Sequence, residues 1–219
     1  MTLFKKKTPM EYIIYSVIII VGIFIDQLSK FLVFSNMERH QSIPLIKDFL
    51  HITYTTNPGA AFGMMEDQRW IFIVISSVAI LAFAVYLYLG HAENLLYGSA
   101  IAMVVSGGIG NMIDRLGFGF YVNENGMGEV IDFIDFCGIW NAIFNGADSF
   151  VCIGAGLMIL ALIIDLVKEY KEEAAKKNAE SNMQNAELTD ETAEPEIQAA
   201  ELNDETAEPE QVAEAGEEE

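Results

Sequence analysis

Residues 70–89 read WIFIVISSVAILAFAVYLYL, a run of twenty residues without one charged side chain. A helix of this length is about 30 Å long, which matches the hydrocarbon thickness of a membrane. A surface helix of a water-soluble protein would instead show polar residues along one face. The run therefore predicts a transmembrane helix.

Three further windows are apolar over a similar length, at about residues 12–34, 95–113 and 143–164. Charged residues interrupt or end them: Asp26, Lys30, Asp114, Arg115, Asp148 and Asp165. The whole chain is 52% hydrophobic, with a mean hydropathy of +0.30. We therefore expect an all-α membrane protein with four transmembrane helices.

The basic residues indicate how these helices are oriented. If the N-terminus is cytoplasmic, seven of the twelve basic residues face the cytoplasm: Lys5, Lys6, Lys7, Lys168, Lys171, Lys176 and Lys177. Basic residues near span ends favour the cytoplasmic side. Both termini are then cytoplasmic, and two longer loops, residues 35–69 and 116–142, face outward.

Most of the net negative charge of the chain comes from its last segment. Residues 178–219 hold fifteen Asp or Glu residues and no Lys or Arg, against a net charge of -20 for the whole chain. The sequence AELTDETAEPE at 186–196 recurs as AELNDETAEPE at 200–210. Such a composition is typical of disorder. We expect a membrane domain at residues 1–177, a disordered acidic cytoplasmic tail at 178–219, and no nucleic-acid partner.

The first outward loop contains IPLIKDFLHITYTT at residues 43–56. Its alternation and its β-branched and aromatic residues predict a short pair of strands at the membrane surface. Such a small extracytoplasmic β element could bind an extended peptide as an added strand. A bare amphipathic loop is an equally good interpretation of the same residues.

Three acids fall near the outer face: Asp114, Asp132 and Asp148. Asn111 and Asn145 each precede an aspartate by three residues, so each amide shares a helix face with a carboxylate. An acid near hydrocarbon is costly to ionise, and two acids close together can share one proton. This pattern indicates hydrolytic chemistry, although pairs that only bridge helices would look the same.

Asp26 and Lys30 lie four residues apart inside the first window, in the order that favours an ion pair on a helix. We interpret them first as a structural pair, and second as a site for a lipid head group or for chemistry. Asp165 is interpreted as a charged stop at the cytoplasmic boundary.

Five ordered segments carry a family resemblance: DQLSK at 26–30, NPGAAF at 57–62, GGIGNMIDR at 107–115, VIDF at 130–133 and FNGADS at 144–149. With the four windows they extend over about residues 11–168, and this part of the chain resembles lipoprotein signal peptidase, also called signal peptidase II. The resemblance implies a multi-pass enzyme of the bacterial cytoplasmic membrane that acts as an aspartic endopeptidase. It would cut a prolipoprotein immediately before a diacylglyceryl-modified Cys, near the outer face.

The resemblance also assigns roles to residues. Asp132 and Asp148 match the catalytic pair, and Asp114 is a supporting residue. We add Asp26 and Lys30 to the supporting or substrate-binding residues on the basis of their own spacing. The remaining matched residues line the substrate site: Asn57, Asn111, Arg115 and Asn145. The resemblance implies no cofactor, a lipid-modified prolipoprotein and membrane lipid as partners, and a monomer. Residues 116–129 form a longer stretch than the family pattern, which leaves Asp135 as a rival to Asp132.

Other chemistries have weaker support. The histidines, His40, His51 and His91, are scattered, so we predict no metal site. Cys137 and Cys152 lack CxxC spacing, and we expect no disulfide between them. A proton- or ion-coupled transporter and a non-catalytic scaffold remain alternative functions. Acids gathered at one face favour a peptidase over a transporter.

Overall fold

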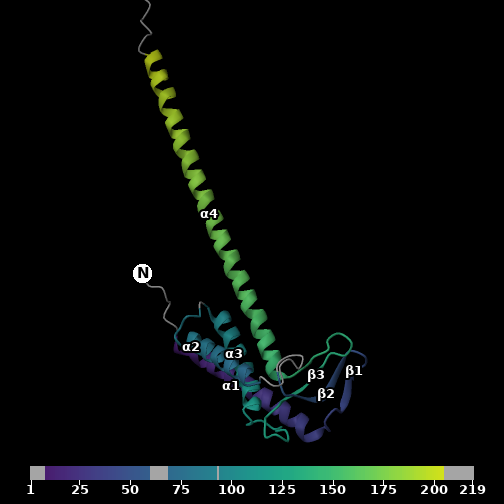
Figure 1. The fold of residues 1–219 in the computed structure, drawn as a ribbon. Helices are drawn as coiled ribbons and strands as arrows, with labels where there is room; N and C mark the ends of the chain where they lie inside the picture. Colours follow the sequence, from purple (N-terminus) through teal and green to yellow (C-terminus); the bar gives the residue numbers. More distant parts are fainter. Residues whose placement is uncertain (1–7, 60–68, 93, 205–219) are drawn as a thin grey trace, which may run out of the picture. The chain divides into compact units, whose positions relative to one another are not determined.

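A computed structural model describes residues 8–59, 69–92 and 94–204, and the chain forms two compact units, Met1–Ile163 and Ile164–Glu219. The first unit contains three whole helices, α1 (Pro9–Asn36), α2 (Arg69–Tyr88) and α3 (Leu95–Arg115) (Figure 1). It also contains the start of α4 (Gly146–Asp204). A small sheet completes that unit.

Among the described residues, three helices are long and apolar enough to cross a membrane: Pro9–Asn36, Leu95–Arg115 and Gly146–Met183. The remaining predicted window is helical as well, but its apolar part, Ile73–Tyr88, is shorter. The structure thus confirms a mostly helical membrane protein, while the number of four spans is not confirmed.

Local signals explain where the helices begin. Thr8 caps α1, because its Oγ1 accepts a hydrogen bond from the Glu11 backbone N and Glu11 Oε2 accepts one from the Thr8 backbone N. Pro9 occupies the first turn, where its missing N–H is harmless. Asn94 caps α3 through the Tyr97 backbone N.

Small residues let the helices of this unit approach closely. A side chain at Gly22 would collide with Ser106, and one at Gly110 would collide with the carboxyl group of Asp26. Close backbone approach at small residues is typical of membrane helices. It places Asp26 of α1 against α3.

The sheet is antiparallel with the order β1 (Ser42–Ile46), β2 (Leu50–Asn57), β3 (Val130–Asp135) and β4 (Ile143–Phe144). The predicted strand pair at 43–56 is therefore confirmed. The sheet packs on the C-terminal part of α1 through Val33, Tyr54, Ile131 and Phe133. This packing places β3, with Asp132, next to the helices.

The second unit corrects one prediction. α4 continues to Asp204, so residues 178–204 are helical in the structure, and the predicted disorder is not confirmed there. Residues 205–219 lie outside the described residues. The segment is rich in Ala and Glu, which favour a helix even where no core can be buried. The composition indicated that the segment cannot bury a core, but it did not indicate that the segment would form a helix.

Candidate active site

A cavity of about 480 Å³ lies where the sheet meets α3 and the start of α4. Its polar lining comes from β2, α3, β3, α4 and the segment before α4: Thr55, Thr56, Asn57, Asn111, Arg115, Asp132, Asn141, Asn145 and Asp148. Six of the nine predicted site residues are in this set. The other three, Asp26, Lys30 and Asp114, form a buried cluster beside it.

Asp132 reaches the cavity from β3 and is 4% exposed. Its Oδ1 accepts a hydrogen bond of 2.6 Å from Asn145 Nδ2, and its Oδ2 accepts one of 3.2 Å from Asn57 Nδ2. Burial, together with the negative charge of Asp148, raises the pKa of the Asp132 carboxyl to about 7, against the opposite effect of the two amide donors. Near neutral pH this carboxyl therefore carries a proton part of the time.

Asp148 lies in the first turn of α4 and is held by two donors. Asn111 Nδ2 donates to its Oδ1 at 2.8 Å, and the Asn145 backbone N donates to its Oδ2 at 3.1 Å. In return the Asp148 backbone N donates to Asn145 Oδ1 at 2.9 Å. This reciprocal pair has the form of a capping box. The start of α4 thus fixes the position of the second acid.

Asn145 connects the two acids. The side chain is fully buried, and its Nδ2 donates both to Asp132 Oδ1 and to Asn111 Oδ1, the latter at 3.1 Å. Its oxygen and its backbone N bind Asp148. One residue therefore holds both carboxyl groups, that of Asp132 through its side chain and that of Asp148 through its backbone N–H.

Lys30 is the centre of the neighbouring cluster. Its fully buried Nζ lies 2.8 Å from Asp26 Oδ2, 2.6 Å from Asp114 Oδ2 and 3.0 Å from Asn111 Oδ1. Asp26 also accepts a hydrogen bond of 2.7 Å from the Ala147 backbone N. The predicted ion pair of Asp26 and Lys30 is confirmed, and the cluster ties α1, α3 and α4 together.

Asp114 does not bind the amide that shares its helix face. Asn111 and Asp114 do share a face of α3, but the amide of Asn111 binds Asp148 and Asp114 binds Lys30 instead. Gln27 Nε2 donates to Asp114 Oδ1 at 3.4 Å and to Asp26 Oδ2 at 3.1 Å. Asp114 therefore belongs to the ion cluster and not to the cavity lining.

Asp135, the rival acid, does not line the cavity. It lies at the other end of β3, where Thr53 Oγ1 donates to its Oδ2 at 2.7 Å. Of the two acids in VIDFID, the structure places Asp132 on the cavity with Asp148.

The long loop before β3 folds back onto the sheet through a residue that sequence reasoning missed. Arg39 donates to Tyr121 Oη at 2.8 Å and to Thr56 Oγ1 at 2.7 Å, and its guanidinium lies 5.1 Å from the centre of the Tyr121 ring. Thr56 lines the cavity. Arg39 thus connects the loop to the cavity wall, and no motif marked it.

Comparison with known proteins shows the family to which this chain is similar. Residues 18–164 match the family model described as signal peptidase (SPase) II. A lipoprotein signal peptidase of Halalkalibacterium halodurans is 37% identical over 164 residues, which is 74% of this chain and 99% of the relative. One of Halothermothrix orenii is 42% identical over 149 residues, 68% of this chain and 94% of the relative.

Solved structures agree with the sequence match. A bacterial membrane enzyme determined by the in meso method at 2.3 Å resolution superposes with a TM-score of 0.60 at 32% identity, over 69% of this chain and 88% of that one. A second such structure, at 1.9 Å, gives 0.57 at 33% identity, over 74% and 97%. This chain therefore belongs to the signal peptidase II family of bacterial membrane peptidases.

Proposed function

We propose that this chain is an aspartic endopeptidase that removes the signal peptide from diacylglyceryl-modified prolipoproteins, cutting before the lipidated Cys. One observation carries the proposal: Asp132 and Asp148 line the same cavity, and Asn145 binds both carboxyl groups. The relatives' name, lipoprotein signal peptidase, supports the substrate class.

The proposed chemistry needs one proton shared by the two acids. The raised pKa of Asp132 supports this state near neutral pH. The ionised carboxylate takes a proton from a water molecule, whose oxygen attacks the carbonyl carbon of the scissile peptide bond. The protonated carboxyl donates to the carbonyl oxygen, and a proton then passes to the leaving amine as the C–N bond breaks.

The surrounding amides have positioning roles in this scheme. Asn57 and Asn145 hold Asp132, while Asn111 holds Asp148. Arg115 lines the same cavity and would offer a positive charge to a substrate carbonyl or head group. The ion cluster of Asp26, Lys30 and Asp114 would support the site by fixing the helices on which these groups stand.

The proposed topology has four spans, with α2 as the fourth. The outward side chains of α2 support this, because large apolar residues are exposed along it: Trp70, Val74, Ile75, Val78, Leu81, Val85 and Tyr88. Such a face suits lipid. Both termini would be cytoplasmic and the cavity near the outer face, in a protein that acts as a monomer in contact with membrane lipid.

The test is cleavage by the purified full-length chain in detergent or lipid. A prolipoprotein carrying the diacylglyceryl group should be cut, and mass spectrometry should find the lipidated Cys at the new N-terminus. The matched substrate without the lipid should be cut far more slowly. Absence of cleavage by a folded protein would contradict the proposal. Proton or ion flux in proteoliposomes without cleavage would favour the transporter instead.

A further inference from the structure

A second group of chemically reactive side chains lies at the end of the sheet, outside the cavity. His51, Asp135 and Cys137 each offer one ligand atom, and these three atoms all lie within 4.8 Å of one another. All three side chains are partly buried. No metal site was expected because the histidines are scattered along the chain. These three residues, however, come from two distant segments that the fold brings together.

Strand pairing explains why they meet. His51 of β2 lies directly opposite Asp135 of β3, and residues opposite each other in an antiparallel pair point to the same face. Cys137 lies in the turn that follows β3, and its Sγ is 4.0 Å from the backbone oxygen of Asp135. The backbone therefore brings the three ligands together.

Further contacts orient two of the three side chains. Thr53 Oγ1 donates to Asp135 Oδ2 at 2.7 Å. Ser42 Oγ lies 3.2 Å from His51 Nδ1 and 2.8 Å from Thr53 Oγ1. Metal-binding histidines and carboxylates are usually held by such contacts. Ser42 and Thr53 thus hold the His51 ring and the Asp135 carboxyl group in place.

The charges of the ligands also favour a cation. A divalent ion would be bound by the Cys137 thiolate and the Asp135 carboxylate together. A thiolate and a carboxylate balance two positive charges, and one N, one S and one O ligand suit Zn²⁺.

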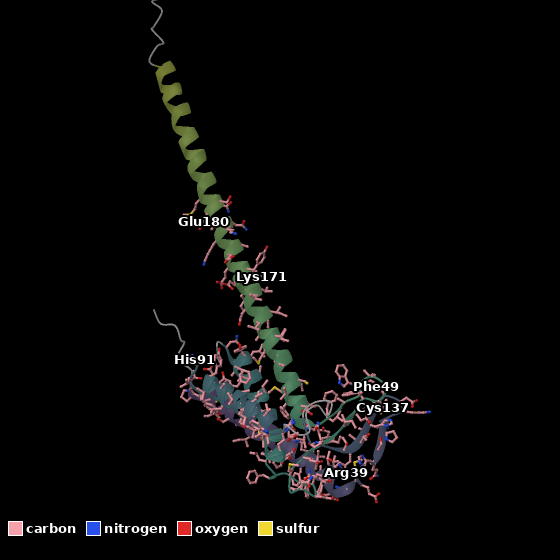
Figure 2. The ribbon with its side chains drawn as sticks, viewed as in Figure 1. Arg39, Phe49, His91, Cys137, Lys171 and Glu180 are labelled. Carbon is pink, nitrogen blue, oxygen red and sulfur yellow. The ribbon has the colours of Figure 1, made fainter. Side chains whose placement is uncertain are left out.

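We propose that His51, Asp135 and Cys137 bind a Zn²⁺ ion that joins β2 to the end of β3, with water completing the coordination. Figure 2 labels Cys137 and Phe49 at this end of the sheet, where the Phe49 ring lies 6.0 Å from that of Phe136. Asp135 also pairs with Ile143, which lines the cavity. The bound ion therefore stabilises one wall of the cavity without taking part in its chemistry.

Co²⁺ titration of the reduced full-length chain in detergent tests the site, because the spectrum reports the ligands. We expect one Co²⁺ per chain, with visible d–d bands and a thiolate-to-metal charge-transfer band, and displacement by Zn²⁺. Cys137→Ser should lose the charge-transfer band. His51→Gln should weaken Co²⁺ binding at least about tenfold, since even contacts outside the ligand set contribute about that much.

Matched controls separate this site from other binding. Cys152→Ser and His91→Gln should keep the Co²⁺ spectrum, and the many carboxylates of residues 178–219 cannot produce a thiolate band. Zn²⁺ should raise the melting temperature of the wild-type chain, but not that of Cys137→Ser or His51→Gln. Co²⁺ binding without a thiolate band, or unchanged binding in both variants, would overturn the proposal. The readout needs no peptidase activity, so it is independent of the proposed function.

Discussion

Two groups of acids lie side by side in this molecule, and they differ in the groups that bind their carboxylates. Asp26 and Asp114 share one lysine, Lys30, and none of these three residues lines the cavity. Asp132 and Asp148 are held only by amides in the hydrogen bonds described, and both face the cavity. A buried carboxylate paired with a cation is stable and inert. A buried carboxylate that has no paired cation and lies near a second acid has its pKa raised, as for Asp132, and can keep a proton that is available for transfer.

The largest effect should follow from substitution in the amide-held pair. We expect Asp132→Asn and Asp148→Asn each to lower turnover at least about 1,000-fold, because each removes a proton-transfer group. The melting temperature should stay within a few degrees of wild type. Asp165→Asn, which changes an exposed pair with Lys168, serves as the control and should keep turnover within about twofold. Near-normal turnover in both site variants would contradict a catalytic role for Asp132 and Asp148.

The lysine-held group should instead control stability. Lys30→Met leaves two buried carboxylates without their cation, and breaking a buried ion pair in this way costs about 3–5 kcal/mol. Thermal or chemical unfolding of the purified variant measures the loss. A variant that is as stable as wild type but inactive would place Lys30 in the chemistry.

Asp114→Asn should have a milder effect than Lys30→Met. It removes one of two negative charges and leaves Lys30 paired with Asp26 at 2.8 Å. We expect a loss of about 1–3 kcal/mol, the usual size for one altered buried hydrogen-bonding group. A larger loss than that of Lys30→Met would show that the cluster does not depend on its cation.

The pH dependence should separate the groups again. The pKa of Asp132 is raised to about 7 from an ordinary value of 3.8, so between these pH values the folded state binds a proton that the unfolded state releases. The free energy of unfolding should therefore fall as pH rises from about 4 to 7, and Asp132→Asn should flatten this slope. Turnover should decline above about pH 7 as the pair loses its shared proton. Turnover that still rises at pH 9 would contradict a shared proton.

The smallest effect should come from removing the largest number of acids. Truncation after Lys177 deletes fifteen acidic residues, which the proposed topology places on the cytoplasmic side. We expect turnover within about twofold of the full chain. A folded but inactive truncation would mean that the site depends on the acidic residues of the tail, and not only on the acids placed at the cavity.

Much of this arrangement could be predicted from sequence because it depends on local pattern. Hydropathy located the helices, alternation located β1 and β2, and the i, i+4 spacing gave the pair of Asp26 and Lys30. The ordered motifs gave the residues that the cavity brings together, with Asp132 and Asp148 among them.

The rest depends on contacts between distant segments. Spacing along α3 could not show that Asp114 binds Lys30 of another helix, nor that Arg39 reaches Thr56. The strand register that places His51 opposite Asp135 is likewise a property of the folded sheet. The predicted disorder of residues 178–204 is also not confirmed, because helix propensity does not require a core.

The most direct test of the central claim is an experimental structure with a peptide transition-state analogue whose central hydroxyl replaces the attacking water. We expect that single oxygen to lie within about 3 Å of a carboxyl oxygen of both Asp132 and Asp148. A hydroxyl bound by only one of the two acids, or two carboxyl groups too far apart to reach it together, would contradict the account.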